Sequence, residues 1–92
     1  MSESVRDLLI RGIAAAKAGH KDEARFFLEW VLRMHPTPEQ ERDALFYLSE
    51  VADDPATKRG YLEDILARNP YDPAARRSLA VLDGRLKPED IV

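Results

Sequence analysis

A ten-residue pattern occurs twice in this chain, and the two copies begin 34 residues apart. Residues 27–36 read FLEWVLRMHP and residues 61–70 read YLEDILARNP, so several apolar positions, one acidic position and the final proline coincide. Repeats of this length with a helical pattern are built from pairs of helices, and each pair buries its apolar face by stacking on the next pair. The repeat therefore predicts a short helical solenoid.

Capping residues indicate where the helices begin. Three predicted starts place an oxygen acceptor directly before a proline, which suits the N-cap and the first helical position: Thr37-Pro38, Asp54-Pro55 and Asp72-Pro73. Thr37 and Gln40 have the spacing of a capping box, and Ser4 with Asp7 is a weaker version of it. Gly19 supplies a stop after the first helix.

These signals divide the chain into five predicted helices. We expect them at about residues 4–18, 21–34, 38–52, 55–68 and 73–84, with a tail over 85–92. Because the connections are short, consecutive helices should be antiparallel neighbours. The predicted fold class is all-α, with a single domain over residues 1–92 that contains two helix pairs and a last helix capping the solenoid.

Composition narrows the functional classes. The 92 residues carry a formal charge of −3 at pH 7, which lacks the positive excess that nucleic-acid binding usually requires. No cysteine is present, so thiol catalysis, thiolate metal sites and disulfides are excluded. The first residues lack a signal-peptide pattern, and no apolar run approaches the roughly 20 residues that span a bilayer. We expect a cytoplasmic protein that binds neither nucleic acid nor a membrane.

The first predicted helix pair resembles the tetratricopeptide repeat, a helical unit of about 34 residues. The matching positions are Leu8, Gly12, Gly19, Ala24, Leu28 and Pro36, whereas Arg11 and Ala15 depart from the family pattern. The second pair matches at Leu62, Ile65 and Pro70, but Lys58 stands where the family has a small residue. The resemblance sets repeat 1 at about 5–36, repeat 2 at about 39–70 and the capping helix at about 73–84. It implies a right-handed solenoid that binds a partner protein along a concave groove lined by the first helix of each pair.

Two positions of this pattern carry expectations about packing. The resemblance implies a close contact between the first two helices at Gly12, where leucine should disturb the packing. Alanine should be tolerated there, because its helix propensity is better by about 1 kcal/mol. Leu28 lies at the large interior position of the second helix, which is apolar around most of its circumference and is expected to be enclosed by neighbours.

The resemblance also assigns a partner groove to residues on the first, third and fifth helices. The implied groove residues are Arg6, Leu9, Ile13, Lys17, Phe46, Glu50, Arg77 and Val81. Its four apolar members would form an exposed strip edged by charge, which is typical of partner sites. The alternative is that these side chains fold over one another and belong to the core. Relatives that grip a peptide's terminal carboxylate do so with Lys and Asn on the first helix, where this chain has Leu9 and Ile13.

A second candidate surface lies on the outer side of the second helix. Phe26 and Trp30 are four residues apart and therefore share one stripe of the helix. They either pack on the third helix or on Ile91 and Val92 of the tail, or they form the contact of a homodimer.

Residues for a reaction are not apparent in the sequence. His20 and His35 lie at opposite ends of the second helix, about 20 Å apart at a rise of 1.5 Å per residue, so they cannot share a metal. Adjacent carboxylates at helix starts are more often caps than an acid and base pair. We therefore expect no enzyme activity and no cofactor.

Positive charge gathers near the C-terminus in Arg76, Arg77, Arg85 and Lys87. This cluster is either a solvated cap or an anion site, and Glu89 and Asp90 partly offset its charge. Taken together, the sequence predicts a non-catalytic protein–protein interaction module that uses the groove. The alternative function is structural self-association through Phe26 and Trp30.

Overall fold

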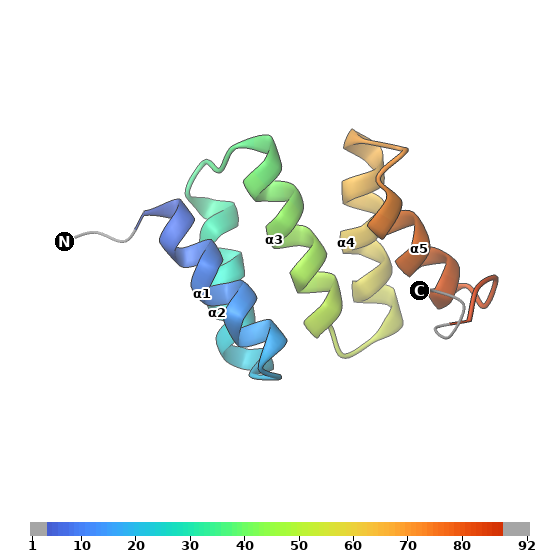
Figure 1. Cartoon of the computed structure of the whole chain (residues 1–92), viewed down its shortest axis with the longest axis horizontal. Coiled ribbons are helices and arrows are strands. Elements are labelled where there is room, and N and C mark those ends of the chain that lie inside the picture. Colours follow the sequence, from blue (N-terminus) through green and yellow to red (C-terminus); the bar gives the residue numbers. More distant parts are fainter. Residues whose placement is uncertain (1–3, 88–92) are drawn as a thin grey trace.

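The computed structural model describes residues 4–87, and these residues form five α-helices and no strand (Figure 1). The helices are α1 (Val5–Lys17), α2 (Lys21–Arg33), α3 (Pro38–Val51), α4 (Pro55–Arg68) and α5 (Pro73–Leu82). The predicted all-α class is confirmed, and each helix end lies within two residues of its predicted place. Residues 85–87 of the predicted tail are described, whereas the rest of the tail lies outside the described part of the chain.

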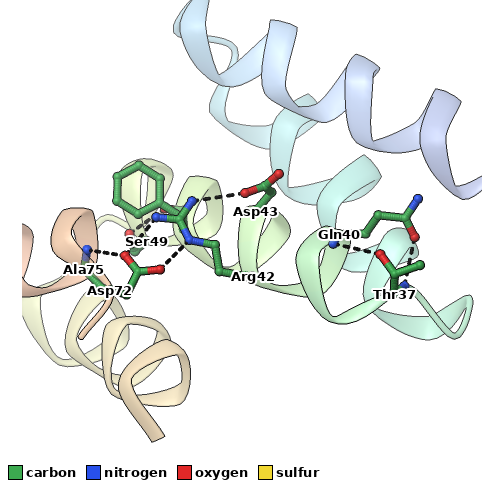
Figure 2. A network of polar contacts seen from close by, with 8 residues as sticks. Thr37, Gln40, Arg42, Asp43, Ser49, Asp72 and Ala75 are labelled. Carbon is green, nitrogen blue, oxygen red and sulfur yellow. Dashed lines mark hydrogen bonds and ion pairs between the residues drawn. The ribbon is translucent and has the colours of Figure 1, made fainter. Parts of the chain in front are cut away.

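The N-caps have the predicted residues. The backbone N–H of Asp7 donates to Ser4 Oγ at 3.1 Å, which satisfies one free donor in the first turn of α1. At the start of α3, the N–H of Gln40 donates to Thr37 Oγ1 at 3.1 Å and the N–H of Thr37 donates to Gln40 Oε1 at 2.9 Å. This reciprocal pair is the predicted capping box, and Figure 2 shows both bonds.

Glycine and proline set the helix ends. Gly19 has a φ of 81°, and the N–H groups of Gly19 and His20 donate to the carbonyls of Ala16 and Ala15. This is a Schellman motif, which closes α1 and turns the chain toward α2. Helices α2 and α4 end before Pro36 and Pro70, as predicted, because the residue before a proline is displaced from the α region.

Along the longest dimension of the described protein, α1 and α2 lie together at one end, and α3, α4 and α5 follow toward the other end (Figure 1). α1 packs against α2, both pack against α3, α3 packs against α4, and α4 packs against α5. The Cα atoms extend over 46 × 27 × 24 Å. Each helix therefore contacts mainly its neighbours in sequence, with the contact between α1 and α3 as the main exception.

The buried residues divide into two clusters. The first cluster lies between α1, α2 and α3, and includes Leu8, Leu28 and Leu48. The second lies between α3, α4 and α5, and includes Leu62 and Ile65. Leu32 of α2 and Tyr61 of α4 pack against both clusters and so connect them.

Helix α2 is less enclosed than its composition suggested. Leu28 is fully buried, but Phe26 is 57% exposed and Met34 is 36% exposed. Within the described residues α2 packs mainly against α1 and α3, and the side that carries Phe26 is left open.

Candidate interaction surfaces

The predicted groove residues on α1 and α3 lie on two helices that pack against each other. Arg6 and Lys17 are exposed, and Ile13 between them is half-buried against the first core cluster. On α3, Phe46 is half-buried and Glu50, four residues later, is exposed. The two helices therefore carry these five predicted residues, of which Ile13 packs against the first core cluster and Phe46 against the second.

Leu9 does not belong to the exposed apolar strip in which it was predicted. Its side chain is only 9% exposed and belongs to the first core cluster with Leu8 and Leu28. Leu9 is buried in the cluster that α1 forms with α2 and α3, so it follows the alternative in which the residue is core. A substitution at Leu9 would disturb folding and cannot report on binding.

Ile10 is an exposed apolar residue on α1 that the sequence analysis missed. It is 54% exposed and precedes Ile13 by three residues. Residues three or four apart on a helix are surface neighbours, so Ile10 lies beside Ile13 and beside Arg6. The sequence could have indicated this, because the spacing of Ile10 from Arg6 and Ile13 places it on the polar side of the helix. We call Arg6, Ile10, Ile13, Lys17, Phe46 and Glu50 the α1/α3 surface.

Phe46 is held in place by three contacts. Its ring meets the ring of Tyr47 edge-on with centroids 5.5 Å apart, and the Arg42 guanidinium carbon lies 4.9 Å from its centroid. Its carbonyl accepts a hydrogen bond from Ser49 Oγ at 2.5 Å. The half-buried ring therefore has neighbours on its own helix and also packs against the second core cluster.

Arg42 links α3 to the start of α5 (Figure 2). Its Nε donates to Asp72 Oδ2 at 2.7 Å and its Nη2 donates to Asp72 Oδ1 at 3.0 Å, while Nη1 donates to Asp43 at 3.0 Å. Asp72 also caps α5 by accepting the N–H of Ala75 at 3.0 Å. These hydrogen bonds, with that from Arg42 the strongest, lower the pKa of the Asp72 carboxyl and raise the pKa of Arg42. The pair fixes α5 relative to α3.

The charges of the α1/α3 surface differ between its two helices. α1 contributes the exposed cations Arg6 and Lys17, and α3 contributes the exposed carboxylate of Glu50. Lys58 of α4 lies 3.6 Å from this carboxylate and donates to the Ser49 carbonyl at 3.0 Å. A lysine at the position where the tetratricopeptide pattern has a small residue thus binds the C-terminal end of α3.

The two predicted groove residues on α5 lie apart from the α1/α3 surface. Val81 is half-buried, and Arg77 lines a hollow of about 370 Å³ between α4 and α5 together with Arg76 and Arg85. α5 packs against α4, and α1 is not among its main neighbours. The eight predicted residues are therefore spread over α1, the central helix α3 and α5 (Figure 1).

Phe26 and Trp30 share a face of α2 as predicted. Their ring centroids are 5.7 Å apart in an edge-on arrangement, and Phe26 meets Phe27 in the same way at 5.3 Å. Trp30 is half-buried against the first core cluster, whereas Phe26 remains 57% exposed. Met34 extends the stripe by one further turn. The proposed cover of this face by Ile91 and Val92 lies outside the described residues.

The search for other kinds of site covered residues 4–87. In this range no group of three or more histidine or acidic side chains could hold a metal ion, and no helix is long and apolar enough to cross a membrane. No family model, curated protein or solved structure matches this chain.

Proposed function

We propose that this chain is a non-catalytic protein–protein interaction module with a right-handed, tetratricopeptide-like arrangement of two helix pairs and a capping helix. Its α1/α3 surface binds an extended or helical segment of a partner protein. The observation that carries the proposal is the exposure of Ile10 beside the half-buried Ile13, with Arg6 and Lys17 as charged neighbours. An apolar centre with a charged rim is the usual anatomy of such a surface.

A photocrosslinking residue at position 10 tests this surface. The same residue at Glu63, which is exposed on α4, serves as the matched control. In cells that make the full chain, we expect a discrete crosslinked protein from position 10 and none from position 63. Equal crosslinking from both positions would show that the α1/α3 surface is not selective.

Substitution then connects the crosslink to binding. Ile10→Asp should abolish co-purification of the crosslinked partner, because a charge replaces an exposed apolar contact while the core is untouched. Tyr71→Asp is the control, because Tyr71 is 78% exposed and lies in the short connection between α4 and α5. Circular dichroism should be unchanged in both variants, and retained binding by a folded Ile10→Asp protein would contradict the proposal.

Self-association through α2 is the second candidate function. It is favoured by the exposed ring of Phe26, next to Trp30 and Met34 on one face. Large aromatic side chains contribute much of the energy of protein interfaces, and a twofold dimer would bury the same face of both copies. Phe26 suits a test better than Trp30, because Trp30 also packs against the core.

Light scattering over a concentration series measures this directly. If α2 forms the interface, the wild-type mass should rise to that of a dimer and Phe26→Glu should remain monomeric with unchanged helicity. Ile10→Glu is the matched control and should still dimerise. A wild-type protein that stays monomeric at the highest attainable concentration would eliminate this function.

A further inference from the structure

The hollow between α4 and α5 combines an apolar floor with a basic rim. Its volume is about 370 Å³, within the range of ligand-binding clefts. The floor includes Leu66 of α4 and Leu79 of α5, together with Leu86, and all three are half-buried. The rim carries the guanidinium groups of Arg76, Arg77 and Arg85.

The end of α5 builds one side of this hollow. Gly84 has a φ of 75°, and the N–H of Arg85 donates to the Ala80 carbonyl at 2.8 Å. The N–H of Leu86 donates to the same carbonyl at 3.2 Å. This Schellman motif reverses the chain and places Arg85 and Leu86 beside the last turns of the helix. The basic rim is therefore fixed by backbone hydrogen bonds.

The arginines of the rim differ from those on the neighbouring helices in their pairing. Arg42, Arg59 and Arg68 each form an ion pair with a carboxylate, namely that of Asp72, Asp83 and Glu41. Within residues 4–87, Arg76 and Arg77 form no ion pair or hydrogen bond through their side chains. Among the described side chains Arg85 reaches Asp83, at 3.4 Å, and Asp83 also binds Arg59. Among residues 4–87, the side chains that line the hollow include three arginines and no carboxylate.

The chemistry of a fitting occupant follows from these two features. Arginine binds carboxylates through two parallel hydrogen bonds, so three such groups favour an acidic ligand. A small inorganic anion would leave the leucine floor exposed to water, whereas a peptide with a large apolar side chain would cover it. We propose that this hollow is a second interaction site, which binds an acidic segment of a partner protein through carboxylates on the rim and an apolar side chain on the floor.

Fluorescence anisotropy with designed probes tests the proposed chemistry on the full chain. The probe is a fluorescein-labelled hexapeptide, Asp-Glu-Leu-Leu-Glu-Asp, and its two controls are Asn-Gln-Leu-Leu-Gln-Asn and Asp-Glu-Ser-Ser-Glu-Asp. We expect saturable binding of the first probe, and binding at least about tenfold weaker for both controls, which is about 1.4 kcal/mol. Serine and leucine probes of equal affinity would indicate a simple anion site and overturn the proposal, as would the absence of binding at about 1 mM probe.

A matched pair of charge variants locates the site. Arg76→Gln with Arg77→Gln should weaken binding of the acidic leucine probe by about tenfold or more, since a hydrogen bond to a charged group contributes about 1.5–3 kcal/mol. Arg11→Gln with Arg33→Gln removes the same charge from exposed positions on α1 and α2, and should change the affinity by less than about twofold. Equal weakening by both pairs would mean diffuse attraction and overturn the proposal. Arg85→Gln alone provides an independent check and should weaken binding without loss of helicity.

Discussion

A β-carbon at residue 12 would lie 2.5 Å from Leu28 Cδ2 and 2.7 Å from Leu28 Cγ, so Gly12 allows α1 to approach α2 more closely than any other residue would. The backbone nitrogen of Leu28 is 3.4 Å from the same point. Leu28 is fully buried and cannot move outward without displacing the first core cluster. The close approach implied by the tetratricopeptide resemblance is therefore present, and it is tighter than expected.

Gly12→Ala should destabilise the protein, which corrects the expectation from helix propensity. Overpacking in a core typically costs about 1–3 kcal/mol, and this exceeds the gain of about 1 kcal/mol from replacing glycine in a helix. Urea unfolding followed by circular dichroism measures the difference. An unchanged or higher midpoint for Gly12→Ala would show that Leu28 relaxes freely.

Gly60→Ala is the matched substitution at a glycine without neighbours. Gly60 lies within α4, and a β-carbon there would have no atom within 4 Å apart from adjacent residues and the backbone of its own helix. Only helix propensity then acts, and we expect the free energy of unfolding to rise by about 0.5–1 kcal/mol. The same urea experiment should therefore move the midpoint in opposite directions for the two glycines. A lower midpoint for Gly60→Ala would contradict the open surroundings of this residue.

Leu28→Ala should be strongly destabilising, because truncation of a fully buried leucine costs about 2–5 kcal/mol. It should also remove the clash that Gly12→Ala creates. In a double-mutant cycle, Gly12→Ala should therefore cost less in the Leu28→Ala background than in the wild type. If the two effects simply add, the contact between these positions does not determine the cost of alanine at residue 12.

Asp72→Asn should lower stability at neutral pH by about 1–2 kcal/mol, because asparagine still caps α5 but cannot pair with the charge of Arg42. The pKa of Asp72 is lowered in the folded state, so its contribution is present above the unfolded value of about 3.9. It is lost as the pH falls below that value through the folded pKa. Urea unfolding at neutral and acidic pH should therefore show the two proteins converging in acid.

Asp54→Asn provides the control for this titration. Asp54 caps α4 by accepting the N–H of Thr57 at 3.0 Å, and its pKa is lowered mainly by that bond. No arginine binds it within the described residues, so its loss of stability should be smaller. Equal losses for Asp54→Asn and Asp72→Asn would mean that the Arg42 pair contributes nothing beyond the cap.

Local signals explain what the sequence predicted well. Thr37 with Gln40, and Asp72 with Ala75, interact across three residues, so the cap chemistry is visible in the chain and fixes the helix bounds. The ion pair of Asp72 with Arg42 could not be predicted in this way, because Arg42 lies 30 residues earlier in the chain. The two side chains meet only because α4 positions α5 against α3.

Surface assignments were harder because they depend on how helices lie against one another. Leu9 was placed in the groove by resemblance, yet the contact of α1 with α3 buries it. Ile10, to which the resemblance assigned no role, is exposed instead. The sequence shows the arginines near the C-terminus as a charge cluster. It does not show the leucines that line the same hollow, because Leu66 and Leu79 come together only when α4 packs on α5.

The division of the buried residues into two clusters has a consequence for cooperativity. Among the five described helices, α3 alone contributes buried residues to both clusters, through Leu48 in one and Leu45 in the other. Helices α4 and α5 can therefore open together while α1, α2 and α3 retain their own core, as a subglobal unit in amide hydrogen exchange. A peptide bound between α4 and α5 would slow exchange in that unit and leave the slowest amides of α1 and α2 unaffected. Amide exchange rates would then distinguish a ligand bound between α4 and α5 from a ligand bound to α1.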